Sequence, residues 1–305
     1  MSLRPILLAI VGDSAAGKST LGDGIGALLG DQRVTVVTTD DYHKHNRKAR
    51  RELRLSALHP DCNDLELLGE HLERLANGEA VQKAPYNHAT GDFDAPREIR
   101  PAEFLIVEGL LGLHSPSLRA HYDVSVYLDT PEPLRHRWKV SRDTERRGYS
   151  AGQVQDVLEH REQLSALFVR PQRAHADMVV RFRPGPNAID DTKLHATVAM
   201  RNQLRHPALP AVLEEAPLAA PRLQLRKQRA GAVLEIDGRI SDAETAQAEQ
   251  ALMRQRPELE HILRRRTGQF TANGTQRHSN ALGLAQLLIA YPVISAKIAR
   301  GDSIR

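Results

Sequence analysis

The stretch GDSAAGKST, from Gly12 to Thr20, constrains the fold of this 305-residue chain more than any other segment. It matches the pattern GxxxxGK[ST] and lies between the apolar run PILLAIVG (5–12) and a helix-forming stretch, which is the setting that a phosphate-binding loop requires. Gly12 and Gly17 allow a tight turn, so that backbone N–H groups and the start of the next helix point at phosphate oxygens. The sequence therefore predicts a strand, a phosphate-binding loop and a helix, in that order.

The loop also supplies side chains with defined chemistry. Lys18 is expected to reach the β- and γ-phosphates of ATP, and the Ser19 hydroxyl is expected to hold Mg²⁺. A second metal-side acid is expected at the end of a neighbouring strand, and Glu108 in LIVEGL (105–110) has that position. The residues of the loop that we expect to bind ATP are Gly12, Asp13, Ser14, Ala15, Ala16, Gly17, Lys18, Ser19 and Thr20.

Strand-like and helix-like segments alternate through the first 185 residues. The helical segment 64–77 places Leu65, Leu68, Leu72 and Leu75 on one face and ends at Asn77-Gly78. The strand-like runs lie at 5–12, 33–40, 104–109, 123–129 and 178–182. Apolar strands joined by helical crossovers indicate an α/β fold with a doubly wound, mostly parallel sheet. Ligands gather at the carboxyl ends of the strands in such folds.

The alternation of strands and helices ends in the rest of the chain, which begins with the Pro-rich passage 184–221. Residues 206–221, HPALPAVLEEAPLAAP, are expected to form a loop. Further strands are expected at 193–200, 222–227 and 232–238, and helices at 281–291 and from Asp242 and Leu259, with Ser241 and Glu244 as a capping box. We therefore divide the chain into a kinase core (1–185) and an antiparallel sheet extension with C-terminal covering helices (186–305), within one compact domain.

Charge and hydropathy narrow the classes of partner. The net charge is +4 and the pI about 9.3, but the basic residues are spread along the chain without an aromatic-interleaved RNA-binding pattern. We expect anionic metabolites and no nucleic acid. No apolar stretch approaches the roughly 20 residues that span a bilayer, so no membrane is expected. The single cysteine, Cys62, excludes an intramolecular disulfide and fits a reducing compartment, and we expect a cytoplasmic protein.

Residues 38–47, TTDDYHKHNR, concentrate acids and bases where the second strand ends. A hydroxyl acceptor gains from a carboxylate that takes its proton as the bond to phosphorus forms, and Asp40 or Asp41 has the position for this role. Basic side chains that follow would attract an anionic acceptor such as a sugar phosphate. These are His43, Lys44, His45, Arg47 and Lys48.

Seven segments carry a resemblance when they are taken together. In chain order they are GDSAAGKST, DDYHKHNR, HPDCNDLELL, APYNHATGDFDAPREIRP, LIVEGL, VYLDTPEPLRHRWKVSRDTERRG and PQRAHADMVV. They resemble the phosphoribulokinase and uridine kinase family of P-loop kinases, and within it the plant and cyanobacterial phosphoribulokinases. VLEIDGRISDAE and ANGT resemble the same group more loosely. The resemblance implies a kinase that uses ATP and Mg²⁺ to phosphorylate the C1 hydroxyl of ribulose 5-phosphate, giving ribulose 1,5-bisphosphate and ADP.

The resemblance also implies roles for the matching positions. Asp40 is the general base, and Lys18 is catalytic. Lys139, Arg142 and Arg147 surround the transferring phosphate, and Asp143 lies among them. The i, i+3, i+4 spacing of Lys139, Arg142 and Asp143 would place these three on one helix face. Arg147 joins the residues expected to bind ATP. The residues expected to contact the sugar phosphate are Asp41, Tyr42, His43, Arg47, Tyr86 and His88.

Two departures bear on regulation. Redox-controlled relatives carry cysteines at the positions of Ala16 and Thr38, so a thioredoxin-controlled disulfide switch is not expected here. The resemblance favours a homodimer or a multiple of it.

Three other functions remain open from the sequence. A uridine or other nucleoside kinase would want an aromatic face for the base, whereas this chain has only one Trp, six Tyr and five Phe and surrounds its acids with His and Arg. A kinase of another sugar phosphate would use the same cationic residues. A regulatory P-loop ATPase would not need Asp40.

Overall fold

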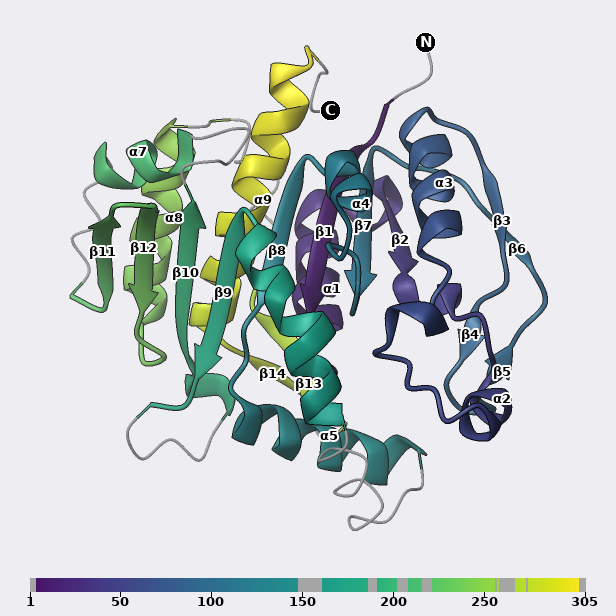
Figure 1. The fold of residues 1–305 in the computed structure, drawn as a ribbon. Helices are drawn as coiled ribbons and strands as arrows, with labels where there is room; N and C mark the ends of the chain where they lie inside the picture. The colour runs from purple at the N-terminus through teal and green to yellow at the C-terminus, as the bar shows by residue number, and fades with distance from the viewer. Residues whose placement is uncertain are drawn as a thin grey trace.

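The structure is a computed structural model that describes residues 4–147, 161–185, 191–201, 208–215, 221–255, 257, 267–272 and 274–301. Among these residues, eight strands form one twisted sheet in the order β11-β12-β10-β9-β8-β1-β7-β2 (Figure 1). The parallel strands are β1 (Ile6–Gly12), β2 (Val34–Thr38), β7 (Phe104–Gly109), β8 (Val124–Leu128) and β9 (Met178–Arg183). The mostly parallel α/β sheet predicted from the sequence is confirmed.

The remaining strands extend the sheet in antiparallel fashion. They are β10 (His195–Arg201), β11 (Leu223–Gln228) and β12 (Gly231–Ile236). Within the described ranges, three two-stranded sheets lie outside the main one. They pair β3 (Val81–Lys83) with β6 (Arg97–Ile99), β4 (Tyr86–Asn87) with β5 (Asp92–Phe93), and β13 (Gln269–Ala272) with β14 (Thr275–His278). The predicted antiparallel extension is therefore present, while the domain boundary at residue 185 stays a prediction.

Strand β1 is buried on both faces, which explains its continuous apolar run. Ile6, Leu8 and Ile10 enter one hydrophobic core, and the alternate residues Leu7, Ala9 and Val11 enter a second. The first core contains the apolar faces of α1 (Lys18–Leu29) and α9 (Asn280–Ala299). The second contains those of α3 (Leu65–Ala76) and α4 (Pro116–His121). This two-sided burial holds the ends of the central strands in a fixed relation to one another.

The helices agree with most of the sequence predictions. Helix α3 buries Leu68, Leu72 and Leu75 and ends at Asn77. Helix α8 (Asp242–Gln255) begins with the predicted capping box, in which the Ser241 and Glu244 side chains each accept a hydrogen bond from the other residue's backbone N–H. The helix predicted from Leu259 lies outside the described residues.

Helix α9 is longer than the predicted segment 281–291. In the described part of the chain it is the one helix long and apolar enough to span a membrane, but 89% of its apolar window is buried inside the protein. It continues through Pro292 to Ala299 because its neighbours bury nearly all of its sides. Helix α9 is therefore a core helix, as predicted for its first half.

The prediction of a loop over 206–221 is wrong for its central part. Helix α7 spans Ala208–Glu215, and its Leu209 and Leu213 are buried in the first core. These two leucines are four residues apart and share a helix face, and Pro210 lies in the first turn, where proline is tolerated. The proline content of the passage misled the prediction, whereas burial of the two leucines favours the helix.

Candidate active site

The carboxyl ends of three parallel strands bring the predicted site together. In the register of the sheet, Ile10 of β1 and Thr38 of β2 both lie opposite Glu108 of β7. The phosphate loop follows β1, and the short 3-10 helix η2 (Thr39–Tyr42), which carries Asp40, follows β2. The phosphate loop, Asp40 and Glu108 therefore meet at the carboxyl ends of β1, β2 and β7. These strand ends lie at the lower edge of the sheet in Figure 1.

The phosphate loop is held in a wrapped conformation by its own residues. Lys18 Nζ donates to the carbonyl oxygens of Gly12 (3.0 Å) and Asp13 (2.9 Å). Gly17 has a φ of 95°, which favours glycine, and a Cβ atom on Gly12 would come within 2.6 Å of the Leu128 carbonyl oxygen. Both glycines are therefore required by the backbone, as the motif predicts.

The metal side of the site consists of two oxygen-bearing residues. Ser19 Oγ donates to Glu108 Oε1 over 3.0 Å. Burial raises the pKa of Glu108, and Asp23 and Asp40 add to this, while Lys18 and the Ser19 hydrogen bond oppose it. A hydroxyl and a carboxylate are oxygen ligands of the kind that Mg²⁺ takes, so the two side chains fit the predicted metal site.

Asp40 lies between two histidines. Its Oδ2 is 3.2 Å from His88 Nε2, and its Oδ1 is 4.0 Å from His43 Nε2. Burial acts to raise the pKa of Asp40, but the hydrogen bond from His88 and the charges of His43, His88 and Lys18 prevail, so the pKa lies well below its usual range. About a quarter of the Asp40 side chain remains exposed. Asp40 is thus an accessible, ionised carboxylate.

The β4–β5 hairpin carries His88 to Asp40. Arg47 fixes the hairpin, because Arg47 Nη2 donates to the His88 carbonyl oxygen over 2.5 Å and the Arg47 N–H donates to Gly91 O over 2.7 Å. The Tyr86 ring packs edge-on against His43 and His88, with centroids 5.0 and 5.1 Å apart. Of the predicted acceptor contacts, His43 and His88 therefore lie beside Asp40, and Tyr86 and Arg47 contact these histidines.

Arg50 belongs to the same group and was missed. Its Nη2 donates to Tyr86 Oη over 2.5 Å, and its guanidinium lies 4.9 Å from the centre of the Tyr86 ring. Arg50 Nη1 is buried and has no hydrogen-bond partner among the described residues. The available signal was helical spacing, because Arg50 follows Arg47 by three positions in helix α2 (Arg47–Glu52).

Asp41 and Tyr42 have other functions than the predicted acceptor contact. Asp41 is 4% exposed, and its Oδ1 accepts the Tyr86 N–H over 2.7 Å; burial raises its pKa. Tyr42 is 1% exposed, and its hydroxyl lies 3.0 Å from His71 Nδ1. Both side chains connect η2 to neighbouring elements, so the prediction that they contact the acceptor is wrong. Successive side chains of the 3-10 helix η2 point in different directions, so Asp40 is the acid of the pair that faces the site.

Helix α5 (Glu132–Arg147) carries the predicted cationic cluster. Lys139 Nζ is 2.6 Å from Asp143 Oδ2, and both side chains are 5% exposed. They share one helix face, as their spacing predicts. The side chains of Arg142 and Arg147 lie outside the described residues, so the roles of all four residues around the phosphate stay predictions.

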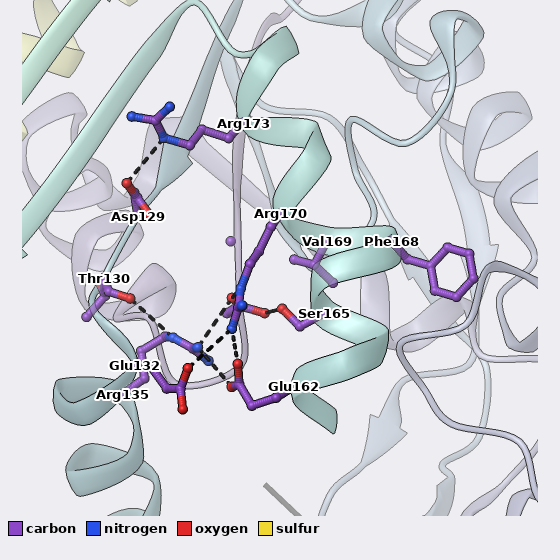
Figure 2. A network of polar contacts seen from close by, with 12 residues as sticks. Asp129, Thr130, Glu132, Arg135, Glu162, Ser165, Phe168, Val169, Arg170 and Arg173 are labelled. Atoms are coloured by element: carbon purple, nitrogen blue, oxygen red, sulfur yellow. Dashed lines mark hydrogen bonds and ion pairs between the residues drawn. The ribbon is translucent and has the colours of Figure 1, made fainter. Parts of the chain in front are cut away.

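A network of arginines and acids holds the phosphate loop from the other side (Figure 2). Ser165, in the π-helical turn η4 (Ser165–Val169), donates to Asp13, and Arg170 Nε lies 3.4 Å from Asp13 Oδ2. Arg135 of α5 is 3.0 Å from Glu162, which also pairs with Arg170. Asp13, predicted to bind ATP, therefore anchors its loop to η4 through its side chain. No local pattern reveals this, because Asp13 and Ser165 are 152 positions apart.

Gln172 connects the same segment to the end of β7. It lies in η5 (Arg170–His175) and is 2% exposed. Its Oε1 accepts the Leu113 N–H and its Nε2 donates to Leu110 O, each over 2.8 Å. The Leu110 N–H in turn donates to Thr39 Oγ1 over 3.2 Å, directly before Asp40. The loop after Glu108 is thus fixed between η5 and η2.

Comparison with known proteins identifies relatives of the chain. The sequence profile of the phosphoribulokinase/uridine kinase family matches residues 7–187. The chain is 33% identical to a phosphoribulokinase of Synechocystis over 181 residues, which is 59% of this chain and 54% of that protein. It is 33% identical to the chloroplastic phosphoribulokinase of Arabidopsis thaliana, over 62% of this chain and 52% of that protein. The chain therefore spans about half the length of these phosphoribulokinases.

Two further similarities complete the comparison. The chain is 35% identical to a uridine kinase of Aliivibrio salmonicida over 62% of its own length and 93% of that protein. Among solved structures, a phosphoribulokinase from Rhodobacter spheroides superposes with a TM-score of 0.59 at 18% identity, covering 86% of this chain and 99% of that chain. At that identity the structural similarity shows the fold.

Proposed function

The chain belongs to the phosphoribulokinase/uridine kinase family, and on that premise we propose that it transfers the γ-phosphoryl group of ATP to the C1 hydroxyl of ribulose 5-phosphate. The products are ribulose 1,5-bisphosphate and ADP. The observation that carries this proposal is the ionised, partly exposed Asp40 carboxylate, which has His43, His88 and the phosphate-loop lysine Lys18 beside it.

On the nucleotide side, each residue of the phosphate loop has a separate task. The backbone N–H groups of the loop bind the ATP phosphates, and Lys18 exchanges its present contacts with Gly12 O and Asp13 O for phosphate oxygens. Ser19 and Glu108 would hold Mg²⁺, which neutralises charge on the β- and γ-phosphates when it is bound. Lys139, Arg142 and Arg147 are proposed to surround the transferring phosphate from helix α5.

On the acceptor side, Asp40 acts as the general base. Its carboxylate is unprotonated at physiological pH and can take the proton of the C1 hydroxyl as that oxygen attacks the γ-phosphorus. The acceptor's own phosphate requires cations, and Arg47 and Arg50 provide them.

A uridine kinase is the second candidate, because the similarity to the Aliivibrio enzyme covers nearly all of that protein. A nucleoside base needs an aromatic face. The Tyr86 ring, which contacts both histidines beside Asp40, already has Arg50 over it and packs edge-to-face with Phe93. The charge around Asp40 therefore favours a phosphorylated acceptor.

Assembly and location complete the proposal. We propose a homodimer or a multiple of it, which the resemblance to phosphoribulokinases supports, and a cytoplasmic location, which the single, buried Cys62 supports. Small-molecule sugar phosphates, and not nucleic acids or membranes, are the proposed partners.

The test is an acceptor panel assayed for ADP release with ATP and Mg²⁺. ADP release should rise steeply with ribulose 5-phosphate, weakly with unphosphorylated ribulose and hardly at all with uridine. Phosphorus NMR of the reaction mixture should show a second phosphomonoester on the sugar. A higher rate with uridine would establish the second candidate, and ADP release that ignores every acceptor would indicate an ATPase.

A further inference from the structure

Asn63 has a fixed orientation that determines where the proton of His43 lies. Asn63 Nδ2 donates to two carbonyl oxygens, Ala57 O at 3.0 Å and His59 O at 2.8 Å. Both N–H bonds of the amide are therefore used, and a flipped amide would direct its oxygen at two carbonyl oxygens. Asn63 Oδ1 must then be the atom that lies 2.7 Å from His43 Nδ1.

This contact assigns the two ring nitrogens of His43. Because Asn63 Oδ1 can only accept, His43 Nδ1 carries the proton and donates it. Burial lowers the pKa of His43, Arg50 and His88 add to this effect, and Asp40 and the Asn63 hydrogen bond oppose it, so the ring is neutral at physiological pH. In a neutral ring protonated at Nδ1, the other nitrogen, Nε2, bears a lone pair.

The lone pair faces the acceptor side of the site. His43 Nε2 lies 4.0 Å from Asp40 Oδ1, which is too far for a hydrogen bond. Two hydrogen-bond acceptors thus lie side by side, and neither can satisfy the other. A ligand that places hydroxyl groups there would satisfy both of them.

We propose that Asn63 is a positioning residue that holds His43 in its Nδ1–H form, so that His43 Nε2 accepts a hydrogen bond from a second hydroxyl of the acceptor. The proposal rests on the proposed function, in which Asp40 takes the proton of the reacting hydroxyl. It specifies the predicted contact of His43 with the sugar phosphate as a contact with a hydroxyl group, because a phosphate oxygen requires a donor. The acceptor class is a polyhydroxylated phosphate ester.

The backbone around Asn63 supports this positioning. His43 and Asn63 form an isolated antiparallel bridge, flanked by hydrogen bonds from Lys44 N to Cys62 O (2.8 Å) and from Asp64 N to Tyr42 O (2.7 Å). Asn63 is 6% exposed, like His43. The segment before helix α3 therefore serves to fix the ring beside Asp40.

The first test is ¹⁵N NMR of the histidine side chains in the whole protein without any acceptor, with the His43 signals assigned from their loss in His43→Gln. A neutral ring protonated at Nδ1 is expected at pH 7 to 8. A ring protonated at Nε2, or at both nitrogens, would overturn the proposal. This readout does not depend on activity, so it remains decisive if ribulose 5-phosphate is not the substrate, which wild-type assays reveal separately.

The second test is kinetic. Asn63→Ala should raise the KM for ribulose 5-phosphate roughly tenfold, the effect of one neutral hydrogen bond, with the KM for ATP unchanged. Asn63→Asp should keep Nδ1 protonated but also charge the ring, whose other charged neighbours are Asp40, Arg50 and His88. Its activity should therefore recover as pH rises, whereas that of Asn63→Ala should not. Asn77→Ala is the matched control, and an Asn63→Ala KM equal to that of the control would overturn the proposal.

Discussion

Ser19 and Glu108 are 89 positions apart in the chain, yet the Ser19 hydroxyl donates a hydrogen bond to Glu108 Oε1 over 3.0 Å. Ser19 lies in the first turn of helix α1, and Glu108 is the last residue but one of strand β7, which is the neighbour of β1 in the sheet. The parallel register of β1 and β7 therefore places a hydroxyl and a carboxylate at one point beside the phosphate loop. This pair is the basis of the proposed Mg²⁺ site.

Glu108→Gln should raise the Mg²⁺ concentration required for half-maximal turnover about 10- to 100-fold, because an amide is a poorer ligand for a hard cation than a carboxylate. Titration of ADP release with MgCl₂ at saturating ATP measures this effect. Glu98→Gln, a change on the exposed strand β6, is the control. A wild-type Mg²⁺ midpoint in Glu108→Gln would show that Glu108 does not bind the metal.

Asp40→Asn should lower kcat about 10²- to 10⁴-fold, because an amide cannot take a proton, while ATP still binds. Fluorescence or calorimetric titration with ATP tests binding, and steady-state ADP release tests turnover. Near-normal turnover in Asp40→Asn would show that another group is the base.

Lys139→Met should destabilise the protein by about 3–5 kcal/mol, because Asp143 loses the cation beside its buried carboxylate. The double variant Lys139→Met/Asp143→Leu should recover most of that stability in urea unfolding. Both variants should remain nearly inactive if the pair acts on the transferring phosphate. An active double variant would give the pair a structural role only.

Glu103→Gln should destabilise the protein most at neutral pH. Glu103 lies 2.7 Å from Arg33 and 2.8 Å from the buried Lys297 of helix α9. The Arg33 hydrogen bond, opposed by burial and aided by Lys297, lowers the pKa of Glu103 to about 2 from an ordinary 4.5. A depressed carboxyl pKa stabilises the fold above the unfolded pKa, by about 3 kcal/mol here, and this stabilisation is lost as pH falls from about 4.5 to 2.

Urea unfolding of wild type and Glu103→Gln across pH 2 to 7 measures this difference. The two stability curves should converge at the acid end. Glu98→Gln serves as the control again, because its partner Arg100 is exposed and a surface pair contributes little. A difference that stays constant across this range would contradict the assigned pKa.

The parts of the site that follow a local rule were predictable from the sequence. The phosphate loop depends on consecutive residues, and the face shared by Lys139 and Asp143 depends on helical spacing. The position after strand β2 predicted an acid at Asp40 or Asp41, and the family resemblance selected Asp40. The predicted acceptor contacts of Asp41 and Tyr42 were wrong, because both side chains are buried and contact Tyr86 and His71 instead. Adjacent residues in a short 3-10 helix point in different directions, and composition does not show which of them faces the site.

The contacts between distant segments could not be predicted from the sequence. The bond between Ser165 and Asp13 and the double contact of Gln172 join residues that only the sheet brings together. The hydrogen bond between Arg50 and Tyr86 could not be predicted, because it joins helix α2 to the β4–β5 hairpin, 36 positions further along the chain. Helix α7 was missed because its stability comes from burying Leu209 and Leu213 against the core.

By itself, the sequence determined a phosphate-binding strand-loop-helix, a mostly parallel sheet and an acid placed to receive a proton, because each depends on neighbouring residues or on one repeating period. Only the tertiary structure decided which side chains meet at that acid. The protonation of His43 illustrates the difference, because it depends on an amide 20 positions away whose own orientation is set by two further carbonyl groups. Hydrogen-bond direction is a property of the assembled neighbourhood, and no sequence period encodes it.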